Sequence, residues 1–120
     1  LKAGTLKIVE KDNHFFSRIH VEDIAKILTL SLKKFNPGQI FNISDNYPCS
    51  NEEIAQYAAN LVKMNIPKKI KLNDIKSIML KNFYKNSKKV SNKKMKNFFR
   101  YDLKYPTFKE GLDMIKNHVA

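Results

Sequence analysis

The sequence predicts an α/β protein, because stretches with helical and strand-like apolar spacing alternate along its 120 residues. A second observation concerns the three glycines, which lie far apart at Gly4, Gly38 and Gly111. Glycines so dispersed cannot form the tight turn that holds the pyrophosphate of a dinucleotide in many α/β proteins. We therefore expect an α/β fold that lacks a dinucleotide cradle.

The first third of the chain predicts two strands and a helix. Residues 6–9 and 14–20 have strand patterns and flank the polar turn at residues 11–13. Residues 21–35 have an apolar face at helical spacing, which we expect to be buried and which comprises Val21, Ile24, Leu28, Leu32 and Phe35, with Ile27 beside them. The Asn-Pro-Gly triplet that follows ends this helix.

Two capping boxes mark later helix starts, at Ser50 with Glu53 and at Thr107 with Glu110. In each, the hydroxyl accepts from the backbone of the third residue on, while the carboxylate reaches back. The final helix is expected to direct Phe108, Leu112, Ile115 and Val119 inward.

Between the capping boxes the sequence predicts short elements. Residues 39–44 (QIFNIS) predict a strand, and lysines alternating with Ile70 and Leu72 predict a half-exposed one. A short helix follows, whose buried residues are expected to be Ile75, Ile78, Met79 and Phe83.

Length and a hydrophobic content of 42% predict one compact domain over residues 1–120. No apolar run approaches the ~20 residues that span a bilayer. Cys49 is the only cysteine and cannot form an internal disulfide, which fits a reducing compartment. We therefore expect a cytoplasmic protein.

The net charge of +12 comes from 21 lysines and two arginines against 11 acidic residues, and it is concentrated in residues 63–96. One interpretation is an electrostatic footprint for nucleic acid or anionic lipid. The other is compositional drift in a lysine-rich sequence, which we favour because base-reading sites rely on arginine. A small basic nucleic-acid-binding or protein-interaction module stays as the alternative function.

Three stretches carry a family resemblance: residues 16–28 (FSRIHVEDIAKIL), 38–61 (GQIFNISDNYPCSNEEIAQYAANL) and 86–112 (NSKKVSNKKMKNFFRYDLKYPTFKEGL). In this order they resemble the C-terminal portion of the extended short-chain dehydrogenase/reductases, the NAD-dependent epimerase/dehydratase family. The similarity is greatest to poorly characterised bacterial members.

The resemblance implies a Rossmann-like oxidoreductase without its N-terminal dinucleotide-binding half. In full-length members a glycine motif holds NAD or NADP, and a Tyr-x-x-x-Lys pair transfers the proton. This chain would begin after both, so we expect no catalytic residue, no cofactor-binding residue and no activity of the chain alone.

Two pairs imitate the Tyr-x-x-x-Lys spacing. Tyr105 and Lys109 are four apart, but Pro106 prevents a helix from running through the tyrosine. Tyr84 and Lys88 lie in a lysine-rich stretch where this spacing arises by chance.

Arg18, His20 and Lys89 are the candidate substrate-binding residues. Arg18 and His20 are expected on one strand face, where they could contact an anionic or hydroxylated substrate, and Lys89 could face a phosphate. Structural roles stay open for all three: His20 can hold loop backbone, Arg18 can pair with Glu22 or Asp23, and Lys89 can be solvated.

The expected partners follow from the missing half. A Rossmann sheet cut across its middle exposes strand edges and apolar helix faces, so we expect docking to that half or self-association. A small-molecule substrate is implied for the full-length family. We expect no membrane partner, disfavour nucleic acid, and expect no metal, because the three histidines are scattered.

Overall fold

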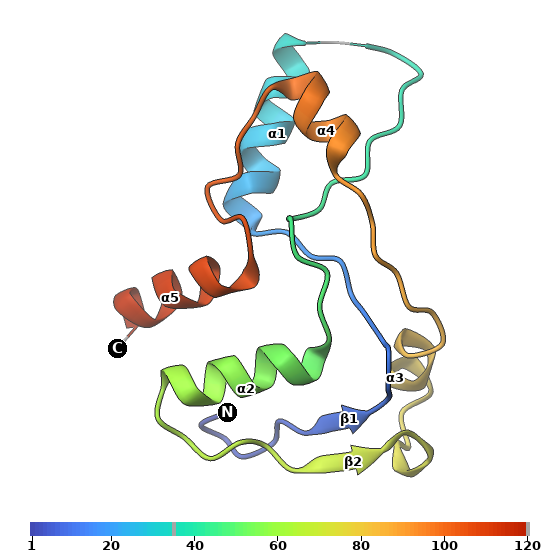
Figure 1. Ribbon diagram of the computed structural model, residues 1–120, viewed down its shortest axis with the longest axis vertical. Coiled ribbons are helices and arrows are strands. Elements are labelled where there is room, and N and C mark those ends of the chain that lie inside the picture. Colours follow the sequence, from blue (N-terminus) through green and yellow to red (C-terminus); the bar gives the residue numbers. More distant parts are fainter. Residues whose placement is uncertain (35, 120) are drawn as a thin grey trace.

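The computed structural model describes residues 1–34 and 36–119, which form helices and a small parallel sheet (Figure 1). The α/β class is thus confirmed. In chain order the elements are β1 (Ile8–Glu10), α1 (Val21–Lys33), α2 (Asn51–Leu61), β2 (Lys69–Lys71), a 3-10 turn η1 (Leu72–Asp74), α3 (Ile78–Phe83), α4 (Lys93–Phe99) and α5 (Phe108–Val119). Phe35 and the side chain of Val119 lie outside what the structure describes.

The sheet pairs β1 with β2 in parallel, with Val9 opposite Ile70. The strand predicted at residues 14–20 is wrong. Its backbone bonds to separate segments instead of one continuous partner: Phe16 bridges Cys49, and Phe15 N donates to Ser87 Oγ at 2.8 Å.

The strand predicted at residues 39–44 is also wrong, since this segment pairs with no strand in the described part of the chain. Its carbonyls accept from side chains instead of a ladder. Lys94 Nζ donates to the carbonyl of Ile40 at 2.8 Å, and Asn92 Nδ2 donates to that of Ser44 at 3.0 Å. The segment is extended but has no neighbouring strand to complete a sheet.

Both capping positions are confirmed as helix starts. Ser50 Oγ accepts from Glu53 N at 3.2 Å at the start of α2, and Thr107 N donates to the Glu110 carboxylate at 3.0 Å before α5. One half of the first box differs: Glu53 accepts from the hydroxyl of Tyr47 at 2.7 Å rather than reaching back. That bond fastens the loop before α2 to its first turn.

Two small clusters of buried apolar residues stand out in the described part of the chain. Val9, Ile75 and Tyr84 form the first, beside the sheet, and Ile27, Met95 and Leu103 form the second, between α1 and α4. Extended segments run between these two ends in Figure 1. The radius of gyration is 16.6 Å, whereas a compact chain of this length has about 14 Å. The described chain is therefore more open than a compact chain of its length.

Helix α1 buries only part of the face that the sequence predicted. Ile27 is buried, whereas Leu28 is 61% and Leu32 86% exposed, and Val21 is exposed too. Asp23, which is 0% exposed, lies on the buried side of the helix as well. Much of the predicted apolar face consequently lies open to solvent.

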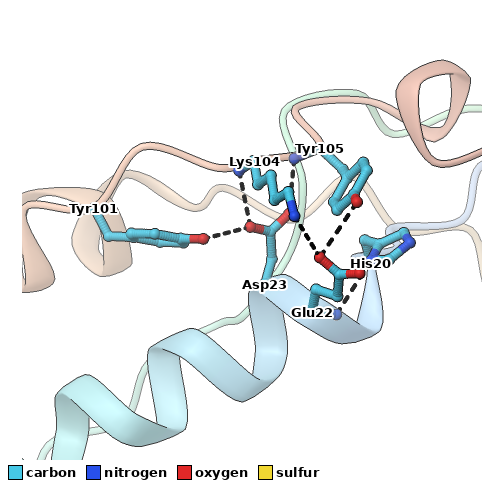
Figure 2. Close-up of polar contacts among 6 residues, drawn as sticks. All are labelled: His20, Glu22, Asp23, Tyr101, Lys104 and Tyr105. Atoms are coloured by element: carbon cyan, nitrogen blue, oxygen red, sulfur yellow. Dashed lines mark hydrogen bonds and ion pairs between the residues drawn. The ribbon is translucent and has the colours of Figure 1, made fainter. Parts of the chain in front are cut away.

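Asp23 binds the segment between α4 and α5 (Figure 2). Its carboxylate accepts from the Tyr101 hydroxyl at 2.7 Å, from Lys104 N at 2.9 Å and from Tyr105 N at 3.0 Å. Burial, followed by the hydrogen bond to Asp23, raises the pKa of Tyr101 to about 12. Beside them Lys104 pairs with Glu22 at 2.9 Å and holds the pKa of that carboxyl below its usual value.

The short helix α3 also differs from its prediction. Ile75, just before it, is buried, but Ile78 is 76%, Met79 71% and Phe83 59% exposed. Only its two flanks, at Ile75 and Tyr84, reach the core beside the sheet. Among the described helices, none is long and apolar enough to cross a membrane.

Removal of the Asp23 carboxylate should destabilise the fold strongly. Asp23→Ala leaves two backbone N–H groups and a phenol without their acceptor, so we expect a loss of at least about 3 kcal/mol in the free energy of unfolding. Urea denaturation followed by circular dichroism measures it. Asp113→Ala, which removes an acceptor of one bond from Tyr57 (2.8 Å), should cost only about 1 kcal/mol. Equal losses in the two variants would contradict the anchoring role of Asp23.

Candidate functional site

Two of the three predicted substrate residues line one cleft. This cleft, of about 240 Å³, lies between residues 18–20, the loop at Asp45, α2 and the start of α5. Its polar groups belong to Arg18, His20, Asp45 and Thr107, and its apolar wall includes Ile54, Phe108 and Leu112. A few polar groups against an apolar wall are typical of a site that orients a small molecule.

His20 caps α1 and faces the cleft at the same time. Its Nδ1 accepts from Glu22 N at 3.1 Å, so the ring proton lies on Nε2. The ring stacks on Tyr105 at 3.8 Å between centroids, as Figure 2 shows. On its other edge Gly111, within α5, comes so close that an added Cβ would lie 3.0 Å from Cδ2. The structural role left open for His20 is confirmed, and its Nε2–H edge lies beside the cleft wall.

Arg18 is held by the chain itself. Nη1 donates to the carbonyl of Cys49 at 3.1 Å and to that of Phe16 at 3.3 Å, and Nη2 donates to Asn51 Oδ1. The pairing with Glu22 or Asp23 that the sequence left open is not the one found, because both carboxylates bind the segment after α4. Arg18 therefore ties the loop before α2 to the wall of the cleft.

Asp45 is the polar residue of the cleft that sequence reasoning missed. It is buried, and its Oδ1 accepts from Tyr47 N at 2.9 Å. Burial raises the pKa of Asp45, and the Tyr47 N–H and Arg18 only partly offset this. Its position in the NISD-P stretch of the family resemblance was the one signal that could have found it.

Lys89 does not line this cleft. Its ammonium lies 4.0 Å from the ring centroid of Phe15. The Tyr84 and Lys88 pair is no catalytic arrangement either, because α3 ends at Phe83 and the Tyr84 hydroxyl is buried, where it accepts from Asn51 Nδ2 at 2.9 Å.

Nothing in the described residues suggests a metal centre or a nucleophile. No group of three or more histidine, cysteine or acidic side chains there could hold an ion. Cys49 is buried, and burial raises the pKa of its thiol to about 11. His14 lies in the aromatic cluster with Phe16 and Tyr84, where burial lowers its pKa.

The solved structures that are similar to this chain include the following two. A functionally unknown conserved protein from Silicibacter pomeroyi DSS matches 96% of this chain with a TM-score of 0.90 and 32% identity. A dTDP-glucose 4,6-dehydratase from Bacillus anthracis str. Ames, solved in complex with NAD, matches 92% of it with a TM-score of 0.70 and 21% identity. No family model and no curated protein matches the chain.

These likenesses define the fold class. The chain is an α/β structure whose fold is similar to part of this dehydratase. It spans 42% of the first neighbour and 33% of the dehydratase, less than half of either.

Gly111→Ala should reveal how tightly His20 is held. Alanine favours a helix over glycine by about 1 kcal/mol, but here its Cβ would press on a ring fixed by Tyr105 and by its own cap bond. We expect a net loss of unfolding free energy in urea denaturation.

The control is to make the same glycine substitution in a His20→Ser variant, which keeps a capping oxygen but removes the ring. There Gly111→Ala should stabilise the chain, giving a coupling energy of at least about 1 kcal/mol. The same effect of the alanine in both backgrounds would show that the two residues do not constrain each other.

Asp45→Asn should make stability less dependent on pH. Because the pKa of Asp45 is raised by folding, the native state loses stability as the pH rises through that value. The amide keeps an acceptor for Tyr47 N. We therefore expect the variant to exceed the parent in melting temperature at neutral pH and to match it below the ordinary Asp pKa of about 3.9.

Asp45→Ala removes that acceptor and should destabilise the chain at every pH. If the Asn variant and the parent differed equally at neutral and acidic pH, the buried carboxyl would not be the source of the difference.

Proposed function

We propose that this chain is the substrate-side part of an NAD(P)-dependent epimerase/dehydratase-like oxidoreductase, acting in the cytoplasm with a dinucleotide-binding half and inactive without it. One observation carries the proposal: 92% of the chain matches part of a dehydratase solved with NAD. The dispersed glycines add support, since the chain offers no glycine-rich turn for a pyrophosphate.

The open surface of α1 also supports a missing half. Leu28 and its neighbours border an apolar groove of about 310 Å³, whose other wall includes Phe41, Ile43 and Phe99. The extended but unpaired segment 39–44 lies beside this groove. An apolar helix face next to an unpaired extended segment is what α/β proteins cover with further strands, so we assign this surface to the dinucleotide-binding half.

The cleft supplies the substrate side of the proposal. His20 Nε2–H can donate to a hydroxyl or anionic oxygen of a small substrate, and Arg18 lends positive charge beside it. Lys89 lies away from the cleft, so we leave it out of the proposed substrate contact.

Neither NAD nor NADP should bind the isolated chain with micromolar affinity. The physical reason is the lack of closely approaching backbone amides for the diphosphate. Isothermal titration with each dinucleotide tests this, and the NAD-binding dehydratase serves as a positive control. Micromolar binding at a single site would overturn the assignment of the cofactor to another half.

A further inference from the structure

The net positive charge of this protein comes almost entirely from one stretch of the chain. Residues 63–96 contain twelve lysines and one acidic residue, Asp74, which gives them a net charge of +11 out of the total +12. All other residues together are almost neutral. Drift in composition along the whole gene does not explain so uneven a distribution.

Helix α3 lies inside this stretch and presents apolar side chains to solvent. We call α3 with its flanking lysines the basic tip: Ile78, Met79 and Phe83, with Lys76, Lys81 and Lys85. The three apolar side chains are each more than half exposed. In Figure 1 the tip lies at one corner of the molecule, beyond the end of β2.

The tip is held in a fixed orientation. Ile75 on one side and Tyr84 on the other are buried against Val9. Ser77 Oγ caps the helix by accepting from Leu80 N at 3.3 Å. With both flanks anchored, α3 cannot turn its exposed side chains into the core beside the sheet.

We infer that the basic tip binds the surface of an anionic lipid membrane. Apolar side chains of a short helix can enter the boundary between headgroups and acyl chains, while lysines beside them contact acidic headgroups. The long lysine stems also lie along apolar surface and keep their ammonium groups in the polar layer. This proposal replaces the expectation of no membrane partner, which rested on the lack of a membrane-spanning apolar run and on the preference for compositional drift.

The same observations favour lipid over nucleic acid. Proteins that bind single strands stack bases on several aromatic side chains, whereas the exposed apolar residues of α3 are Ile78, Met79, Leu80 and a single aromatic residue, Phe83. No arginine occurs in residues 63–96, although arginine is the preferred forked contact to phosphates and bases. An aliphatic and thioether surface has a matching partner in acyl chains.

Vesicle flotation of the full chain tests this inference. We expect it to float with vesicles of phosphatidylcholine and phosphatidylglycerol. With vesicles of phosphatidylcholine alone, we expect the protein to remain unbound in the lower fractions. Replacement of the three apolar residues by serine should reduce the partition coefficient at least tenfold. The variant combines Ile78→Ser, Met79→Ser and Phe83→Ser.

Lysine substitutions test the electrostatic part. Lys76→Gln, Lys81→Gln and Lys85→Gln together should weaken binding about a hundredfold at low salt, because each lysine near an anionic surface contributes about 1 kcal/mol. Matched lysines outside the basic tip are Lys26 and Lys33 on α1. Their glutamine variants should bind nearly as the parent does.

A second control separates the tip from the proposed docking face. Leu28→Ser with Leu32→Ser removes equally exposed apolar side chains on α1 and should leave flotation unchanged. Failure to float with anionic vesicles, or equal flotation of the α3 serine variant, would overturn the inference. So would tight, salt-sensitive binding of single-stranded RNA that the α3 serines leave intact while flotation is absent.

Discussion

The carboxylate of Asp23 determines how the rest of the molecule is arranged. A buried carboxylate is costly unless hydrogen bonds satisfy it, and here the three donors come from one short segment, residues 101–105. That requirement places the segment across the first turn of α1 and sets which side of the helix faces inward. Tyr105, whose backbone N–H donates to Asp23, in turn supplies the ring on which His20 stacks.

The open shape follows from the same constraint. With α1 rotated to bury Asp23 and Ile27, its most apolar stripe faces solvent, and the second core is limited to a few side chains from α1, α4 and the segment after α4. The first core is equally small and lies at the other end. Two small cores joined by extended segments do not close on each other, and the cleft with Arg18 and His20 lies where those segments meet α5.

Local signals were predicted well from the sequence. The helix starts at Ser50 and Thr107 were predicted because capping depends on residues three apart. The expectation that the His20 ring could hold nearby backbone is also local, because it came from its place just before the helical pattern. The parallel pairing of β1 with β2 was not predictable, since strands depend on partners distant in sequence.

Helical spacing predicted where α1 and α3 lie but not which face is buried. In α1 the apolar face is wide, and periodicity alone cannot tell that Ile27 is buried while Leu28 and Leu32 at its edge are exposed. The deciding residue was Asp23, a polar one, whose burial depends on donors about 80 positions away. Asp45 escaped prediction likewise, because only the folded chain buries its carboxyl beside Arg18.

The exposed apolar surfaces of α1 and α3 differ in the charged residues that border them. This difference favours a different partner for each surface. The groove beside α1 is lined by apolar side chains and Ser31, so a further protein layer could fill it without burying a charged lining residue. The exposed side chains of α3 lie among lysines. If another protein layer buried these side chains, the lysine ammonium groups beside them would be desolvated. A lipid headgroup layer imposes no such cost, because it lets apolar atoms enter while the lysines stay hydrated and next to opposite charge.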